Sequence, residues 1–333
     1  MQKSTKLYVA LLGLFIIAMY LLAYVPRYID YFKDTSKVVT VEGKIFFHSD
    51  RFGKKGQTIC VLEQGKITPI EGGLEPVYNE KLRKIMYWGG LDKRGLLVID
   101  FLGGQTIRVP KTKDYSIIGF DWSHDGKKVC FASRMGDKTY NIYTMNIDGT
   151  DLKKLTHYEQ AIGWEIGAPK WSPDDRKIVF DGPNLMRTVK PDWAKTPLHP
   201  GTMYIIDSDG SNLINVIGEK EMGGGNAAWS SDGRRLVFAG SVRGSRRRDL
   251  FIYSVETKDI KRVTHDEFED REPTFSPDGK QIAFVSYPRD IKKGSELFVI
   301  NTDGTGRARL TPPKRRQFGL RWVEDRYPRW YQR

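Results

Sequence analysis

The sequence predicts an all-β fold, a six-bladed β-propeller closed by strands from both ends of the chain and preceded by one transmembrane helix. Three observations predict it: repeated copies of an aromatic residue followed by a Ser-x-Asp-Gly-like turn, two complementary half-copies near the ends, and an uncharged apolar segment at residues 7–25. The 33 glycines and 16 prolines among 333 residues are also typical of a chain with many tight turns.

The apolar segment at residues 7–25 carries no charged side chain. As a helix it would rise about 28 Å, enough to cross the hydrocarbon core of a bilayer. Lys3 and Lys6 precede it, whereas the charges that follow nearly cancel, so residues 1–6 are expected in the cytoplasm and the rest outside. The alternative is a cleaved secretory signal, but the apolar stretch is long for one and no small-x-small cleavage site follows. We therefore expect a single-pass protein of the inner membrane, with residues 26–40 as a linker.

The repeats are aligned by their opening aromatic residue, and in each copy another aromatic lies nine residues later. Tyr78 opens a degenerate copy that lacks the Asp-Gly. The starts at 78, 122, 171, 229 and 275 are 44, 49, 58 and 46 residues apart, which suits four-stranded propeller blades. The four well-formed copies open at Trp122, Trp171, Trp229 and Phe275.

Each repeat predicts four strands joined by tight turns, because Gly, and to a lesser degree Asp, adopts the positive φ that hairpins need. A proline stands two residues before the opening aromatic in three copies, at Pro76, Pro169 and Pro273. The segment Trp322 to Asp325 looks like the first half of a repeat and the segment from Gly43 like the second half. Together they make one composite blade, which gives six blades over residues 41–325 and removes open sheet edges.

These repeats resemble those of the TolB-like propellers over residues 40 to 325, nearly the whole chain after the linker. The resemblance implies the propeller fold and protein partners in the cell envelope, on its periplasmic side. A propeller fold by itself carries many unrelated activities. The resemblance concerns the propeller repeats alone and not the extra domain of TolB, so a direct role in the Tol machinery does not follow.

The two faces of the predicted propeller differ. Turns between first and second strands are short, whereas long irregular segments join second to third strands at 181–202, 243–249 and 287–294. Such loops on a rigid scaffold tend to carry function, although loop tips also tolerate insertions. The predicted partner-binding residues on this face are Trp193, His199, Arg243, Arg246, Arg247 and Arg248.

The residues after the predicted last strand, 326–333, form a basic aromatic tail on the short-turn face, near the linker. Arg and interfacial aromatic side chains can meet anionic headgroups, so a membrane-surface contact is one interpretation and a tail packed on blade one is the other. The residues expected in this contact are Arg326, Arg329, Trp330 and Tyr331.

The net charge of +13 points to acidic partners. An extracytoplasmic location makes nucleic acid improbable and leaves anionic lipid, an anionic polysaccharide or an acidic protein surface. Most clusters of positive charge are solvated surface, and this remains the alternative.

A search for chemistry finds no catalytic constellation, no nucleophile elbow and no phosphate-binding loop. Cys60 and Cys130 lie in apolar strand-like runs and are expected as buried free thiols. His157 and His265 follow equivalent fourth strands, and repeat structure explains them without a metal, although acidic neighbours leave a hard-cation site at the mouth as an alternative. These neighbours are Glu159, Glu165, Asp266, Glu267, Glu269 and Asp270. The sequence therefore predicts no catalytic residue, no metal and no cofactor.

The favoured function is a membrane-anchored, extracytoplasmic scaffold that binds a protein or glycan. A variant of this hypothesis is a subunit of an envelope or membrane complex. The rival is a hydrolase or lyase that acts on a saccharide at the central mouth. Acidic and His side chains meeting in an axial pocket would favour the rival, and a flat or plugged mouth the scaffold.

Overall fold

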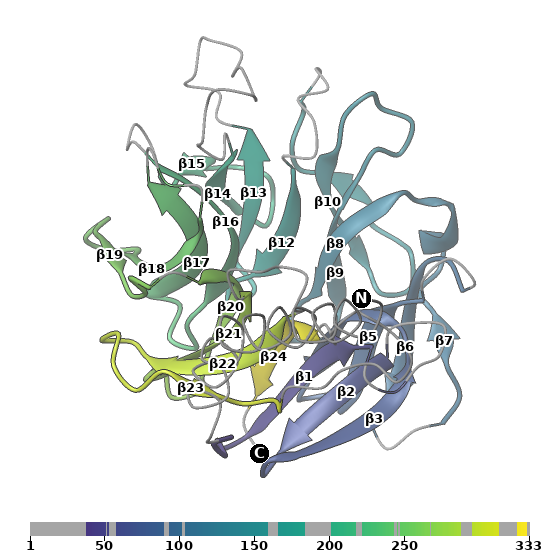
Figure 1. The fold of residues 1–333 in the computed structure, drawn as a ribbon. Helices are drawn as coiled ribbons and strands as arrows, with labels where there is room; N and C mark the ends of the chain where they lie inside the picture. Colours follow the sequence, from purple (N-terminus) through teal and green to yellow (C-terminus); the bar gives the residue numbers. More distant parts are fainter. Residues whose placement is uncertain are drawn as a thin grey trace, which may run out of the picture. The chain divides into compact units, whose positions relative to one another are not determined.

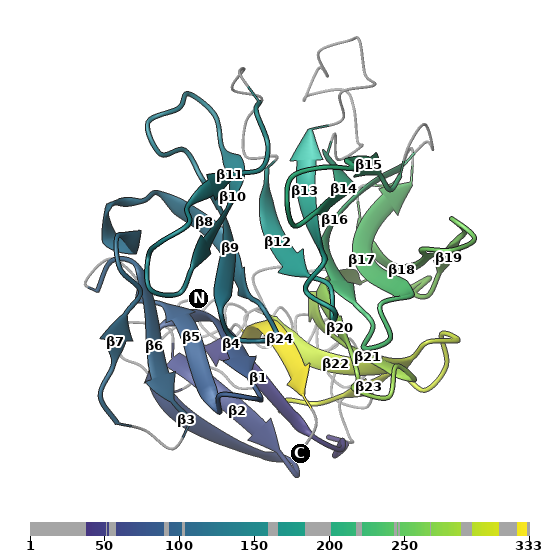
Figure 2. The same cartoon turned by 180° about the vertical axis from the view of Figure 1, so that it is seen from behind.

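The chain folds into six antiparallel sheets of four strands each, arranged around a central axis (Figures 1 and 2). The structure is a computed structural model that describes residues 38–50, 52, 58–89, 93–101, 104–158, 166–183, 201–217, 222–242, 245, 247–266, 268–287, 295–312 and 325–331. Val39–Arg333 forms one unit, the propeller. The predicted six blades are confirmed.

Blades are numbered from the composite one, and their strands in chain order have the following bounds. Blade one contains β1 (Lys44–Ser49), β2 (Thr58–Glu63), β3 (Lys66–Gly72) and β24 (Asp325–Tyr331); blade two β4 (Leu74–Asn79), β5 (Lys84–Trp88), β6 (Leu96–Asp100) and β7 (Ile107–Arg108); blade three β8 (Ile117–Trp122), β9 (Lys128–Ser133), β10 (Asn141–Asn146) and β11 (Lys153–Lys154). Blade four contains β12 (Gly167–Trp171), β13 (Lys177–Pro183), β14 (Gly201–Asp207) and β15 (Ile214–Asn215); blade five β16 (Met222–Trp229), β17 (Arg235–Val242), β18 (Asp249–Ser254) and β19 (Ile260–Arg262); blade six β20 (Glu269–Phe275), β21 (Gln281–Tyr287), β22 (Glu296–Asn301) and β23 (Ala308–Arg309). A short 3₁₀ helix, η1 (Thr112–Asp114), precedes β8.

The Ser-x-Asp-Gly motif forms the turn between first and second strands. In blade three the Ser123 hydroxyl donates to Asp125 at 2.7 Å and accepts from the Lys128 N–H at 2.8 Å. Gly126 has φ +79°, a conformation that favours glycine. Blades four, five and six repeat the Ser–Asp hydrogen bond, so the motif is scaffold.

The hydrophobic core lies between neighbouring blades. In blades two to six it includes the aromatic residue that stands nine positions after the opening aromatic. These rings are fully buried on the second strands, where alternation directs them into the interface between sheets. Cys60 and Cys130 are buried free thiols, which confirms their expected place in the core. The buried rings are Tyr87, Phe131, Phe180, Phe238 and Phe284.

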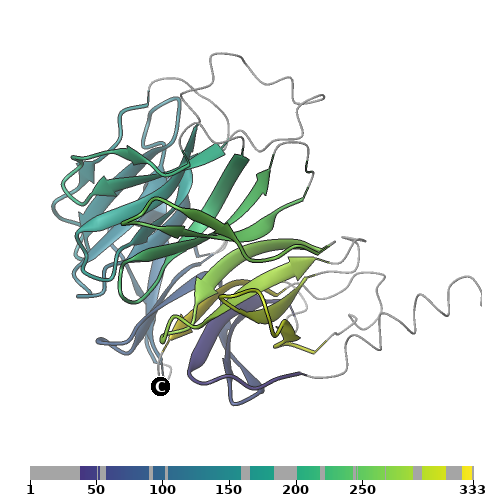
Figure 3. The ribbon, with the colours of Figure 1, turned by 90° about the vertical axis from the view of Figure 1, so that its left-hand side faces the viewer.

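The closing strand is real but lies further along the chain than predicted. β24 pairs with β1 in an antiparallel ladder that runs from Asp325 opposite Ser49 to Tyr331 opposite Lys44, with one register shift between Phe46 and His48. Figure 3 shows the yellow end of the chain beside the purple β1. The opening aromatic of blade one is Trp330, which is 8% exposed and donates from Nε1 to the Glu42 carbonyl at 2.7 Å. The innermost strand of blade one therefore extends past the predicted boundary at residue 325, and its apolar ring is Trp330.

The same strand corrects the expected tail. Residues 326–331 are not a free basic segment but part of β24, with Trp330 packed in the core of blade one. The interpretation of a tail packed on blade one is the one that the structure supports.

The predicted anchor at 7–25 lies outside the described residues. Within the part of the chain that the structure describes, no helix is long and apolar enough to span a bilayer.

Candidate functional site

Each of the six innermost strands contains a β-bulge at the same place, three residues before the opening aromatic. The ladder shifts register there in all six blades. The residue at the bulge has a positive φ, between 46° and 73°. Bulges of this kind turn a side chain away from the sheet. We call them the bulge residues: Glu75, Gly119, Ala168, Asn226, Glu272 and Tyr327.

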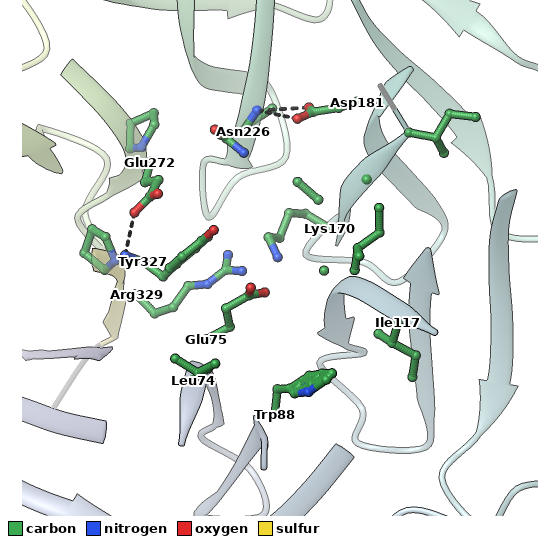
Figure 4. A pocket seen from close by; sticks show the side chains of 18 residues that line it. Leu74, Glu75, Trp88, Ile117, Lys170, Asp181, Asn226, Glu272, Tyr327 and Arg329 are labelled. Atoms are coloured by element: carbon green, nitrogen blue, oxygen red, sulfur yellow. Dashed lines mark hydrogen bonds between the residues drawn. The ribbon is translucent and has the colours of Figure 1, made fainter. Parts of the chain in front are cut away.

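These bulges surround a cavity of about 550 Å³ at the axial mouth, the axial pocket. All six innermost strands contribute to it (Figure 4). The bulge residues that line it lie toward the end of the propeller where first strands begin and second strands end, the end at which Gly167 of β12 pairs with Asp181 of β13. In the sequence, the predicted long segments follow the second strands at this end. Its lining combines apolar and polar side chains. The apolar ones include Leu74, Trp88, Ile117, Ile118, Ile166 and Ala227, and the polar ones are Glu75, Lys170, Asp181, Asn226, Glu272, Tyr327 and Arg329.

Three bulge residues have their backbone N–H bound by a side chain of the preceding blade. The Glu75 N–H donates to His48 Nδ1 at 3.1 Å, and the Asn226 N–H donates to the Asp181 carboxylate at 2.9 and 3.0 Å. His48 and Asp181 occupy equivalent positions, directly after the buried aromatic of a second strand. The Tyr327 N–H donates to Glu272 Oε2 at 2.7 Å. These polar side chains hold the bulges in place.

Burial changes the protonation of these groups. Burial lowers the pKa of His48 to about 3, with a smaller effect from Arg326, so the imidazole is neutral and Nδ1 accepts. Burial raises the pKa of Asp181 to about 7, although the Asn226 N–H and Arg248 act against it. Burial also raises the pKa of Glu75, against the attraction of Lys170.

Lys170 and Arg329 are the cations at the pocket. Burial, and then the charge of Arg329, lowers the pKa of Lys170 to about 8. The Lys170 ammonium donates to the Phe120 carbonyl at 3.0 Å. The Arg329 side chain is 17% exposed, and its guanidinium lies 4.0 Å from Asp121. In Figure 4 the ends of Glu75, Lys170 and Arg329 point toward one another.

The negative charge of Glu272 is balanced by an ion pair inside the fold. It is 7% exposed, and its Oε1 accepts from Arg326 at 2.6 Å. Arg326, expected at a membrane surface, is therefore part of an ion pair beside the pocket. Arg329, expected at the same surface, lines the pocket, and the Tyr331 hydroxyl accepts from the Tyr78 N–H at 3.1 Å.

Most of the predicted partner-binding residues lie outside the described residues, namely Trp193, His199, Arg243 and Arg246. Arg247 is exposed. Arg248 is half-buried, and its charge acts on Asp181 of the pocket. The role predicted for these arginines stays a prediction.

The histidines that the structure describes do not meet at the mouth. His157 and His265 are both exposed, and the His124 ring, in the first turn of blade three, lies 3.0 Å from Asp175 in the first turn of blade four. Asp266 and Asp270 bind Arg307 at 2.6 and 3.0 Å. Glu159, Glu165 and Glu267 lie outside the described residues. Among the residues that are described, no three His, Cys, Asp or Glu side chains come together as metal ligands.

Sequence reasoning missed the charged residues of the pocket, because it searched the long loops. A signal was present: Glu75 and Glu272 share the position three before the opening aromatic, and Lys170 and Arg329 the position one before it. Aligning the repeats by column would have placed these four side chains around the axis.

Comparison with known proteins supports the fold. No family model matches the chain. It is 27% identical over 182 residues to the uncharacterized peptidase YuxL of Bacillus subtilis, which covers 54% of this chain and 23% of that protein. It is 27% identical over 109 residues to the Tol-Pal system protein TolB of Francisella tularensis subsp. mediasiatica, which covers 33% of this chain and 24% of that one. The chain thus spans about a quarter of the length of these curated relatives.

Solved structures are similar over more of the chain. TolB from Acinetobacter baumannii superposes with a TM-score of 0.66 at 16% identity, covering 87% of this chain and 67% of that one. An oligogalacturonate lyase in complex with manganese superposes with a TM-score of 0.55 at 16% identity, covering 81% and 74%. At such identities the likeness concerns the fold alone.

Proposed function

Because the chain is a TolB-like six-bladed propeller with a charged pocket at its axial mouth, we propose that it is an interaction module that binds a segment of a partner protein there. The observation that carries the proposal is the axial pocket itself. It combines an apolar wall with half-buried charged groups, and such mixed concave sites bind ligands. A flat or plugged mouth would have left only the outer loops for binding.

The setting that we propose is the cell envelope. Residues 7–25 anchor the chain in the inner membrane, residues 1–6 remain in the cytoplasm, and the propeller works on the periplasmic side. The uncharged apolar segment and the flanking lysines support this proposal. A reporter enzyme that is active only outside the cytoplasm, fused after the propeller, should be active, and activity only with a cytoplasmic reporter would contradict it.

The partner is proposed to be a protein of the envelope or of a membrane complex. TolB proteins, similar over a third of this chain, are named for the Tol-Pal system. The net charge of +13 adds anionic lipid or polysaccharide as further partners of the outer surface.

The pocket can be tested by filling it. Ala168→Trp places an indole at the pocket wall, and Leu213→Trp is the matched control in the same blade, because Leu213 is 47% exposed and lies on the opposite face, between β14 and β15. Both full-length variants are purified in detergent with their bound proteins, and melting temperatures verify that they fold. We expect Ala168→Trp to lose a partner that wild type and Leu213→Trp retain. The same partners in all three would contradict the proposal.

A second candidate is a lyase or hydrolase that acts on an acidic saccharide in the same pocket. Lys170 favours it, because a lysine with a pKa of about 8 can act as a general base near neutral pH. Incubation with a polyuronate should then give shorter products with new reducing ends that Lys170→Met no longer forms, and these products are unsaturated if the reaction is an elimination. Absence of product from wild type would remove this candidate.

A further inference from the structure

Two cations lie at the inner end of the axial pocket. Lys170 on β12 and Arg329 on β24 each precede the opening aromatic of their blade by one residue. The bulge residues precede it by three, so the two cations lie two residues further along the innermost strands. A group that reaches them must pass the bulge residues first.

These cations have hydrogen-bonding capacity left. A guanidinium carries five N–H donors, and within the described residues that of Arg329 makes no hydrogen bond. Its contact with Asp121, at 4.0 Å, is longer than a hydrogen bond. Lys170 uses one of its three N–H groups, on the Phe120 carbonyl. Both side chains line the pocket, so their remaining donors are available to a ligand that enters it.

The nearby carboxylates do not supply that partner. Asp121 Oδ2 accepts from the Trp171 N–H at 2.9 Å. The Glu75 carboxylate accepts no hydrogen bond from any residue that the structure describes, although it points toward the two cations. Burial raises the pKa of Glu75, which favours its uncharged form beside an incoming anion.

Part of the wall of the same cavity is apolar, and it includes Trp88, Ile117 and Ile166. A volume of about 550 Å³ accommodates only a few residues. A chain end fills such a space with one strand, whereas a loop must enter and leave through the same mouth.

Building on the proposed function, we propose that the axial pocket binds the C-terminal end of a partner polypeptide. Lys170 and Arg329 bind its terminal carboxylate, and the apolar wall takes up an apolar last side chain. Arg suits a carboxylate because its planar fork can donate two parallel hydrogen bonds.

The test uses the full-length protein in detergent and three labelled short peptides. The first ends in leucine with a free carboxylate, the second is its carboxamide, and the third is a carboxamide ending in glutamate. Binding is followed by fluorescence anisotropy up to millimolar protein. We expect the free acid to bind about tenfold or more tightly than both carboxamides, as for the loss of a charged hydrogen bond.

Variants locate the effect. Lys170→Met and Arg329→Gln should each remove the preference for the free acid, and either suffices if the other does not fold. Arg234→Gln is the control, because Arg234 is exposed in the turn between β16 and β17 and does not line the pocket. The control should bind like wild type.

Several results would overturn the assignment. Equal binding of acid and carboxamide, no binding of any peptide, or an unchanged preference in both pocket variants would each refute it. Tighter binding of the glutamate carboxamide would show that a side chain supplies the carboxylate and would also refute the chain-end assignment. If only this inference fails, Ala168→Trp still loses its partner; if Ala168→Trp keeps its partner, the proposed function itself has failed.

Discussion

Replacing Trp330 tests the closure of the ring. Trp330→Ala removes an indole that is 8% exposed and packed with Ile45 and Phe47 of β1. A buried Trp removes about 200 Å² from water, which at about 25 cal/mol per Å² amounts to about 5 kcal/mol, and core Trp→Ala changes cost about 3–5 kcal/mol. Loss of the hydrogen bond to Glu42 adds about 1 kcal/mol. The expected total of about 4–6 kcal/mol is a large part of a typical domain stability of about 5–15 kcal/mol.

The assay is urea unfolding of the full-length chain in detergent, followed by circular dichroism. Trp330→Phe keeps most of the apolar area and loses the hydrogen bond, so we expect a cost of about 1–2 kcal/mol. Leu213→Ala, at a side chain that is 47% exposed, serves as the control and should change little. A loss below about 1 kcal/mol for Trp330→Ala would refute the assignment of β24 as the closing strand.

Three further predictions concern the bulges. Gly119→Ala should cost about 2 kcal/mol, because φ is +73° and the new Cβ would lie 2.9 Å from the Ala168 nitrogen, whereas Gly72→Ala, with nothing within 4 Å, should not destabilise; urea midpoints compare them. His48 has a folded pKa of about 3 against 6.5 unfolded, so the unfolded chain binds the proton first and stability falls as pH drops below 6.5. Its contribution should be about 2 kcal/mol smaller at pH 5 than at pH 7, and a wild-type loss on acidification no larger than that of His48→Gln would contradict this. For Asp181, with a folded pKa of about 7 against 3.8, the folded chain binds the proton first, so its contribution falls as pH rises through that window. In the same unfolding assay, the free energy of unfolding of Asp181→Asn relative to wild type should therefore increase from pH 4 to pH 8. A difference between the two proteins that does not change with pH would argue against the raised pKa.

The blades were predictable because each repeat carries its own turn chemistry and its own buried rings. Trp122 and Phe131 belong to one hairpin, so their spacing is visible in a few residues of sequence. Blade one was harder, since its strands come from both ends of the chain. The clue was Pro328, two residues before Trp330, the spacing already seen at Pro169 and Trp171.

The axial pocket was less predictable for a physical reason. Glu75, Lys170 and Arg329 are about a hundred residues or more apart in sequence and meet only when the ring closes. No local pattern gives their separation across the axis. The pKa shifts of Glu75 and Lys170 depend on burial, which follows from that closure and not from neighbouring residues.

The closing strand also links the pocket to the stability of the ring. Arg329 lies on β24, so a chain in which β24 has detached from β1 has lost both a blade and part of the pocket. Any ligand that binds Arg329 therefore favours the closed form, by about 2.7 kcal/mol when present at about 100 times its dissociation constant. Binding and ring closure are then two coupled equilibria, and a bound partner would act as a clasp across the seam between the first and last strands.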